Sequence, residues 1–215
     1  MTWGLIAGAL AKGDDLRSAA AHAAFEKLLR SDGVLLSVGG GPTRIHPRLR
    51  NLNILCQRGV DLTADAYRLP FADASLGGVH CEAVLEHLEY PDRAVAEMHR
   101  VLQPDALAFA VTPFLQPYHA YPEHYQNFTL RGHTRLFERA GFTIVDAGSC
   151  VGPTFAMVDL AANYAREFTP GRVPSRALER AIRFLGRAVR LPDVRLRHHG
   201  AADKLASSTY VLARR

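Results

Sequence analysis

Carboxylates and histidines gather in two short segments of the chain, and each segment follows an apolar run. These residues are Glu82, Glu86, His87, His119 and His124. Histidine changes its charge near neutral pH, so it can take a proton from an acceptor group that lies within hydrogen-bonding distance. We therefore predict a catalytic base among these residues, with His119 or His124 in first place and Glu86 with His87 as the second pair.

Three tyrosines accompany the histidines of the second segment. They are Tyr118, Tyr121 and Tyr125, and they bring the number of rings in residues 118–125 to five. Loops at strand ends commonly carry binding residues, and tyrosine rings pack against sugars and other rings. We predict that these tyrosines bind an acceptor molecule. No metal site is predicted, because the only carboxylate beside the two histidines is Glu123 and the spacing matches no common ligand pattern.

A glycine-rich turn follows the first apolar run, residues 34–38. Gly39, Gly40 and Gly41 stand in succession there. Glycine has no side chain, so a turn built from it lets the backbone approach a ligand closely. Because open α/β sheets bind ligands at the carboxyl ends of their strands, we expect a nucleotide-type ligand at this turn.

The order of the motifs resembles that of class I S-adenosylmethionine-dependent methyltransferases, especially the small type 11 group. The matching segments are the glycine turn, LPFADAS at 69–75, VLEH at 84–87, RVLQP at 100–104 and the aromatic segment 113–129. The resemblance covers residues 34–149 and implies methyl transfer from S-adenosylmethionine to a small-molecule acceptor. Similarity to glycan- and natural-product-modifying members favours a hydroxyl group of a sugar or small metabolite.

The resemblance also implies which residues hold the cofactor. Asn53 falls where the family has an acidic residue that binds the ribose hydroxyls, with Asp61 as its rival. The implied cofactor-binding residues are Gly39, Gly40, Gly41, Asn53, Asp65, Ala66 and Glu82, with Asp65 accepting from the adenine amino group. An asparagine brings no negative charge to a diol. The alternative is therefore a methyltransferase-fold protein that binds ligand without methyl transfer, as a scaffold, regulator or non-methylating catalyst.

The fold implied by the resemblance is α/β and Rossmann-like, with a mostly parallel seven-stranded sheet and helices on both faces. Strands are expected at 34–38, 52–55, 60–65, 76–81, 107–112, 142–145 and 208–212, and helices at 15–30, 91–102, 130–140 and 174–191. An acidic residue at 14 or 15 is expected to cap the first helix. Only nine residues separate Gly41 from Asn51, and Pro42 and Pro47 interrupt them, so the first crossover helix is expected to be shortened.

A chain of 215 residues suits one domain with a sizeable core. We predict a single domain with an N-terminal helical cap at 1–32, a cofactor-binding core at 33–150, a basic helical insertion at 151–204 and the last strand at 205–215. From residue 151 onward, twelve Lys and Arg face five Asp and Glu. We rank the insertion as a lid, then a dimer surface, then a membrane-surface element, although a charge run is most simply a solvated helix face.

Other classes of function fit these residues less well. The dehydrogenase fingerprint Gly-x-Gly-x-x-Gly would need glycine at Arg44, and the basic tail has too few aromatic residues to bind nucleic acid by stacking. The three widely spaced cysteines argue against disulfides, so a cytoplasmic location is expected. The apolar opening at 1–10 is too short to span a membrane, so no transmembrane segment is expected. The sequence is compatible with peripheral membrane contact and with a homodimer.

Overall fold

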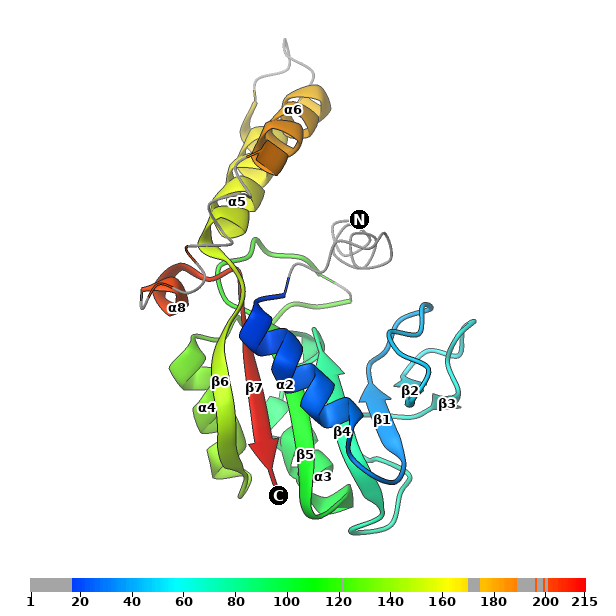
Figure 1. Ribbon diagram of the computed structural model, residues 1–215. Helices are drawn as coiled ribbons and strands as arrows, with labels where there is room; N and C mark the ends of the chain where they lie inside the picture. Colours follow the sequence, from blue (N-terminus) through cyan, green and yellow to red (C-terminus); the bar gives the residue numbers. More distant parts are fainter. Residues whose placement is uncertain (1–16, 121, 170–174, 189–195, 197–198, 200) are drawn as a thin grey trace.

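The computed structural model describes residues 17–120, 122–169, 175–188, 196, 199 and 201–215 (Figure 1). Within these residues seven strands form one sheet, in the order β3-β2-β1-β4-β5-β7-β6. The strands are β1 (Leu35–Val38), β2 (Leu49–Asn53), β3 (Leu62–Thr63), β4 (Leu76–Glu82), β5 (Leu102–Pro113), β6 (Thr143–Val151) and β7 (Ser208–Arg214). Neighbouring strands from β3 to β5 are parallel, whereas β7 runs antiparallel to β5 and β6. The prediction of a mostly parallel seven-stranded sheet is confirmed.

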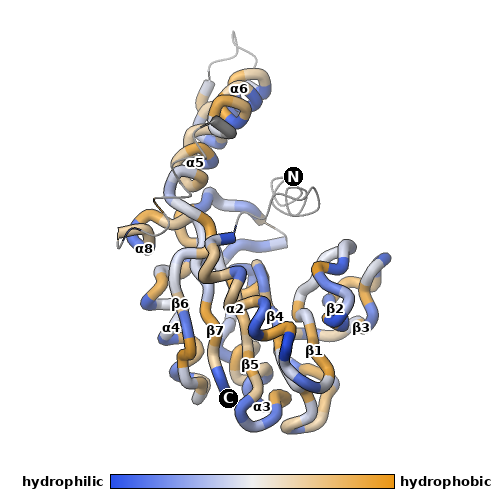
Figure 2. The backbone as a smooth tube through the Cα atoms, viewed as in Figure 1, coloured by the Kyte–Doolittle hydropathy of each residue, from blue (hydrophilic) through white to orange (hydrophobic). Residues whose placement is uncertain are grey.

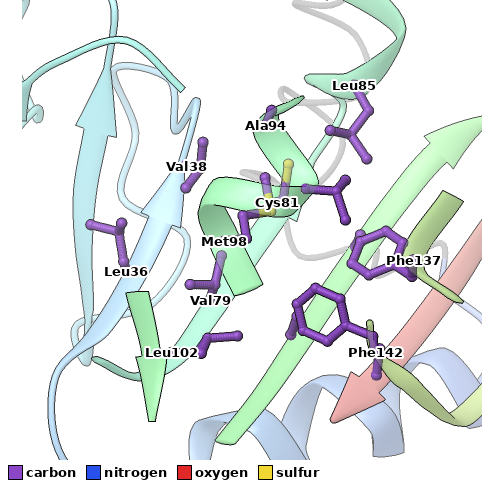
Figure 3. Packing of buried hydrophobic residues seen from close by; sticks show 14 of the residues in the cluster. Leu36, Val38, Val79, Cys81, Leu85, Ala94, Met98, Leu102, Phe137 and Phe142 are labelled. Atoms are coloured by element: carbon purple, nitrogen blue, oxygen red, sulfur yellow. The ribbon is translucent and has the colours of Figure 1, made fainter. Parts of the chain in front are cut away.

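Helices cover both faces of the sheet, as predicted (Figure 1). They are α2 (Ala19–Leu29), α3 (Pro91–Val101), α4 (Leu130–Arg139), α5 (Pro153–Phe168), α6 (Ser175–Ala188) and α8 (Ala202–Leu205), with the 3-10 helix η1 (Leu85–His87) soon after β4. Helix α2 packs Phe25 and Leu28 into a core on one face. On the other face, α3 and α4 bury Met98 and Phe137 in a second core (Figure 3). Each such side chain contributes roughly 1.5–3 kcal/mol of transfer free energy.

The connection from β1 to β2 contains no helix, so the shortened first crossover is confirmed. Side-chain hydrogen bonds hold it instead: Asn51 Nδ2 donates to the Gly41 carbonyl at 2.8 Å. Asp61 accepts from the Asn51 amide at 2.7 Å and from Arg44 at 2.5 Å. The Asn51 amide and then the Arg44 guanidinium lower the pKa of the Asp61 carboxyl below its usual value. Asp61 is therefore engaged in shaping this connection.

Several strands differ in extent from their predicted ranges. Strand β2 begins at Leu49, which pairs with Leu35 and is buried although its neighbour Arg50 is exposed. Strand β3 covers only Leu62–Thr63. Strand β5 begins early, at Leu102, which pairs with Leu76 of β4, and β6 extends along β7 as far as Val151. Strand β6 lies at the edge of the sheet and is only partly buried, so its apolar pattern is too weak to show its length.

The helix before β1 begins later than expected and has a different cap. The side chain of Ser18 accepts from the Ala21 amide at 3.1 Å, which satisfies one of the unpaired amides at the start of α2. Residues 14 and 15, where the cap was expected, lie outside the described part of the chain, as does the apolar stretch 1–10. The predicted cap of α4 is confirmed, since Thr129 Oγ1 accepts from the Gly132 amide at 3.1 Å.

The insertion before β7 forms a helical hairpin of α5 and α6 that projects from the sheet (Figure 1). Arg183 of α6 lies inside the hairpin and pairs with Asp159 at 2.7 Å and Glu179 at 3.1 Å. At Gly186 a Cβ atom would lie 2.4 Å from a methyl of Val158, so the two helices are in close contact. Part of the basic charge expected on this insertion is therefore neutralised inside the hairpin.

Apolar side chains also remain exposed on the hairpin, and Figure 2 shows hydrophobic residues alternating with hydrophilic ones along both helices. The exposed apolar residues here are Met157, Leu160, Tyr164, Phe168, Leu178, Phe184 and Leu185. In the part of the chain that the structure describes, no helix has the length and apolar character needed to cross a membrane.

His133 should make the fold sensitive to acid. Its ring is fully buried, with Nδ1 3.1 Å from the hydroxyls of Thr112 and Thr209, and burial lowers its pKa to about 3. The unfolded chain binds a proton at this histidine below about pH 6.5, whereas the folded protein stays neutral there. The stability that His133 contributes is therefore present above pH 6.5 and is lost as the pH falls toward 3.

We expect His133→Gln to reduce the slope of the free energy of unfolding against pH by up to about 1.4 kcal/mol per pH unit between pH 6 and 4. Urea unfolding of both proteins at several pH values measures the slope. Equal slopes would show that His133 does not carry the effect.

Candidate active site

The carboxyl edge of the sheet collects the predicted cofactor-binding residues. Strand β1 pairs in parallel with β2 and β4, with Val38 opposite Leu52 on one side and Cys81 on the other. Gly39, Asn53 and Glu82 each stand one residue beyond these positions. They therefore lie together at one edge of the sheet, next to the carboxyl end of β3. This is the edge at which open α/β sheets bind ligands.

The three glycines of the turn differ in what a side chain at each position would contact. Gly39 has a φ of +72°, and a Cβ atom there would lie 2.1 Å from a methyl of Val84. A Cβ atom at Gly40 would lie 1.5 Å from Asn51 Oδ1. The first two glycines are thus required by the packing of the protein itself. At Gly41 a Cβ atom would meet no atom of the described part of the chain within 4 Å, so this glycine faces space that these residues leave open.

Asn53 ties the end of β2 to the glycine turn. Its Nδ2 donates to the Gly40 carbonyl at 2.8 Å, and its Oδ1 accepts from the Leu55 amide at 2.9 Å. A carboxylate at this position accepts hydrogen bonds only, so it could not make the bond to the Gly40 carbonyl. The hydrogen bonds of Asn53 thus explain why an asparagine stands at this position. The sequence alone did not predict them.

Asp65 and Ala66 follow β3 at the same edge. Asp65 Oδ1 accepts from the Tyr67 amide at 2.9 Å, which fixes the turn, and the exposed carboxylate keeps its second oxygen available to a ligand. Ala66 is partly buried against the core. Both residues lie at the carboxyl edge of the sheet, and their contact with the adenine ring stays a prediction.

Glu82 is the last residue of β4 and belongs to a buried polar chain. Arg17 donates to its carboxylate at 2.6 Å, His80 Nε2 lies 3.3 Å from the same oxygen, and His80 Nδ1 lies 3.1 Å from the Ser37 hydroxyl. Burial by itself would raise the pKa of Glu82, but the charge of Arg17 and the bond to His80 outweigh it and lower the pKa to about 2. Glu82 is therefore ionised at neutral pH. Sequence reasoning missed Arg17, because a single arginine before a helix carries no motif.

The second predicted group meets where η1 faces the loop after β5. The Tyr125 amide donates to the Glu86 carbonyl at 2.9 Å, and Gln126 Nε2 donates to the Leu88 carbonyl at 3.1 Å. These bonds fasten the loop onto η1. As a result, His119 of the loop lies beside Glu86 and His87, although it stands more than thirty residues further along the chain.

The side chains of Glu86, His87 and His119 converge in this place, with one ligand-type atom from each lying within 4.8 Å of the others. Glu86 Oε1 is 3.7 Å from His87 Nε2 and 4.0 Å from His119 Nε2. The Glu86 side chain is fully buried, and neither of its oxygens has a hydrogen-bond partner among the described residues. Burial raises the pKa of Glu86 to about 8 and lowers the pKa of both histidines.

The hydrogen bonds of the two histidines fix the side of each ring that carries the proton. His87 Nδ1 lies 2.6 Å from the Glu123 carbonyl, and His119 Nδ1 lies 2.9 Å from the Pro117 carbonyl. A carbonyl only accepts, so each Nδ1 carries the hydrogen. Each Nε2, which faces Glu86, therefore carries a lone pair in the neutral ring.

The other predicted loop residues surround this cluster. His124 Nδ1 accepts from the His119 amide at 3.1 Å, and its Nε2 lies 2.7 Å from Asn127 Oδ1, so both ring nitrogens are engaged. Its ring stacks on Tyr118, with the centroids 5.7 Å apart. The rings of Tyr118 and Tyr125 are largely exposed. Tyr121 lies outside the described residues.

A pocket connects the two groups of residues. Its lining includes Arg17 just before α2, Glu82 at the end of β4, Glu86 of η1, Gln116 of the loop after β5, Phe155 at the start of α5 and Ser208 at the start of β7. Glu82 and Glu86 thus face a common space. A ligand in this pocket would lie between the carboxyl edge of β4 and the base of the helical hairpin.

Comparison with known proteins shows which proteins share this arrangement. Residues 43–110 match the family model described as a methyltransferase domain. No curated protein sequence matches the chain. The [4+2]-cyclase SpnF is 16% identical, with a TM-score of 0.56 over 91% of this chain and 79% of that one. An S-adenosylmethionine-dependent methyltransferase of Thermotoga maritima, a possible histamine N-methyltransferase, is 13% identical, with a TM-score of 0.55 over 91% and 87% of the two chains.

A third similar structure contains the cofactor. Phosphoethanolamine N-methyltransferase 2 of Haemonchus contortus, in complex with S-adenosyl-L-methionine, is 11% identical to this chain, with a TM-score of 0.57. The match covers 91% of this chain and 52% of that one. At these identities the structures show a shared fold, and the family match adds the type of domain. The chain therefore has the fold of class I S-adenosylmethionine-dependent methyltransferases, and its residues 43–110 match a methyltransferase domain, which supports S-adenosylmethionine as the cofactor.

The residues at the carboxyl edge fit this cofactor. Gly41 leaves space beside the turn that no atom of the described residues fills, and Asp65 offers a carboxylate oxygen just after β3. A carboxylate is a suitable acceptor for an adenine amino group, and a turn without side chains lets the ligand lie against the backbone.

Proposed function

We propose that the protein transfers a methyl group from S-adenosylmethionine to a hydroxyl group of a sugar or small metabolite. The observation that supports this most directly is the cluster of Glu86, His87 and His119 beside the pocket. A hydroxyl must lose its proton as it is methylated, and the cluster holds two imidazole lone pairs next to Glu86, which lines the pocket. We propose His119 rather than His124 as the histidine involved, because both nitrogens of His124 are engaged elsewhere.

The chemistry follows from these positions. The cofactor supplies a methyl group on a positively charged sulfur, which is already activated for transfer. The task of the protein is to hold the acceptor oxygen in line with that methyl group, and good alignment contributes roughly 7–11 kcal/mol. The ring of His119 accepts the hydroxyl proton at Nε2, and the backbone carbonyl of Pro117 holds the ring in the required orientation through Nδ1.

The acceptor would enter between the loop after β5 and the helical hairpin. Phe155, in the first turn of α5, lines the pocket and gives the hairpin a direct part in the site. We propose that the hairpin acts as a lid over the acceptor. Tyr118 and Tyr125 present exposed rings near the same loop and would pack against a sugar or another ring.

One experiment tests the function and a role for His119 together. The purified protein is mixed with S-adenosylmethionine and a panel of hydroxylated sugars and small metabolites, and formation of S-adenosylhomocysteine is measured. We expect His119→Ala to lower turnover by about 100-fold, which is the low end of the usual gain from a base. Calorimetric titration with S-adenosylhomocysteine should give the same affinity for this variant and for the wild type.

The matched control is His22→Ala, since His22 lies on the exposed side of α2 with its side chain 53% exposed. This variant should keep full turnover. If the wild type binds S-adenosylhomocysteine but no acceptor in the panel is methylated, the alternative of a non-methylating protein becomes the better explanation. The similarity to the [4+2]-cyclase SpnF supports this alternative, because that protein has a related fold.

A further inference from the structure

We propose that Glu86, His87 and His119 bind a divalent transition-metal ion. The three side chains converge from η1 and from the loop after β5, and they turn one carboxylate and two imidazole nitrogens toward one another. No metal was expected from the sequence, because the ligands of the proposed site are separated along the chain and meet only through the path of the loop.

The positions of the hydrogen atoms make this cluster suited to a cation. Both rings donate Nδ1–H to backbone carbonyls, so both Nε2 atoms point lone pairs at Glu86. Neither oxygen of Glu86 has a hydrogen-bond partner from another described residue. In its ionised form Glu86 adds a third acceptor to the two imidazole nitrogens, and a metal ion supplies the positive charge that would hold three such acceptors together.

The same hydrogen bonds are those that orient metal-binding histidines. A histidine ligand usually donates its second ring nitrogen to a carbonyl or carboxylate, which fixes the tautomer and directs the other nitrogen to the metal. His87 meets this requirement through the Glu123 carbonyl and His119 through the Pro117 carbonyl. Both supports are backbone atoms of the same loop, so the loop itself holds the rings in place.

The distances suit a small ion after a slight contraction. Metal bonds of about 2.0–2.1 Å in a tetrahedral arrangement place the ligand atoms about 3.4 Å apart. The distances from Glu86 Oε1 to His87 Nε2 and His119 Nε2 are 3.7 Å and 4.0 Å. The two distances from Glu86 therefore need to shorten by about 0.3 Å and 0.6 Å, and all three ligand atoms already lie within 4.8 Å of one another.

Two imidazoles and one carboxylate favour a transition metal over magnesium or calcium, which prefer oxygen ligands. Three protein ligands also leave coordination positions open, as in catalytic zinc sites. Glu86 lines the pocket proposed for the acceptor, so an acceptor hydroxyl can take an open position on the ion. The bound ion lowers the pKa of that hydroxyl, whose proton leaves to water as the oxygen takes the methyl group. In this form His119 acts as a ligand and not as the base.

Only this use of the ion rests on the proposed function; binding of the ion does not. The test is therefore made without cofactor or acceptor. Full-length protein carrying no histidine tag is treated with a chelator, dialysed and titrated with Co²⁺ and Zn²⁺, and binding is followed by calorimetry and by the visible absorption of bound Co²⁺. We expect one ion per chain.

The variants His119→Ala and Glu86→Gln should each weaken binding by at least about tenfold. The matched control is His22→Ala, because His22 and Glu26 form an exposed histidine–carboxylate pair at 4.0 Å that shows how strongly a surface pair binds. Thermal unfolding of each variant shows whether it is folded. The proposal is overturned if the wild type binds no ion, or if folded His119→Ala and Glu86→Gln bind it as tightly as the wild type.

A separate titration with S-adenosylhomocysteine distinguishes this outcome from failure of the proposed function. Binding of the metal without S-adenosylhomocysteine would leave the metal site in place and argue against methyl transfer. Binding of S-adenosylhomocysteine without metal would leave His119 as the base. Where both bind, turnover that disappears on chelation and returns with Zn²⁺ or Co²⁺ supports the ion as the group that promotes loss of the proton.

Discussion

Replacing Gly41 by valine should abolish binding of the adenosyl cofactor while the protein remains folded. A Cβ atom at Gly41 meets no atom of the described residues within 4 Å, so this part of the fold has room for the side chain. The same space lies at the carboxyl end of β1, where the cofactor is expected. A valine would therefore fill volume that the ligand needs, and we expect the affinity for S-adenosylhomocysteine to fall by about 1,000-fold, which is roughly 4 kcal/mol of binding free energy.

Calorimetric titration with S-adenosylhomocysteine measures the effect, and thermal unfolding checks the fold. Gly41→Ala is the matched control, since its single methyl group is far smaller and should weaken binding much less. Gly39→Val is a poor test, because Gly39 has a positive φ and a Cβ there would strike Val84. Its loss of binding would reflect damage to the turn. Unchanged binding in Gly41→Val would show that the cofactor does not lie against this glycine.

Replacing Arg17 by methionine should destabilise the fold by about 3–5 kcal/mol at neutral pH. The Arg17 guanidinium lies 2.6 Å from Glu82, and the two side chains are 7% and 13% exposed. Methionine keeps most of the volume but removes the charge, so an ionised carboxylate remains buried without its main partner. Urea unfolding at pH 7 measures the loss.

The pH dependence of the same pair gives an independent check. In the wild type the pKa of Glu82 is about 2, below the usual value of 4.5. Its contribution is therefore present above pH 4.5 and is lost as the pH falls toward 2. The difference between wild type and Arg17→Met should be largest at pH 7 and should shrink below pH 4.5. The double variant Arg17→Met with Glu82→Gln should recover part of the stability, since it removes the unpaired charge. A difference that does not change with pH would contradict this account.

The main features of the fold follow from local chemistry that the sequence displays. The prolines between Gly41 and Asn51 exclude a long helix, and the structure has none there. The apolar positions of α3 recur at helical spacing and are buried, and Thr129 caps α4 as its side chain predicts. These features are readable because each depends on neighbours a few residues away in the chain.

The ends of several elements were not readable for the opposite reason. Strand β6 extends because β7, far along the chain, pairs with it, and strand β5 begins early because Leu102 pairs with Leu76 of β4. Strand β2 begins with Leu49, whose burial depends on its position beside β1. Pairing across a sheet is decided by distant segments, so a weak or interrupted apolar pattern understates the length of a strand.

The sequence by itself determined the types of residue in the site, and the tertiary structure decided what they do. Motif order sufficed to single out Glu86, His87 and His119, because each follows a strand that ends at the same edge of the sheet. The tautomer shared by His87 and His119 depends on backbone carbonyls of the loop, and the positions of these carbonyls cannot be read from the sequence. The pairing of Arg17 with Glu82 likewise joins residues 65 positions apart. Such contacts depend on how the folded backbone brings distant segments together, and that is why only the structure reveals a cluster able to hold a cation.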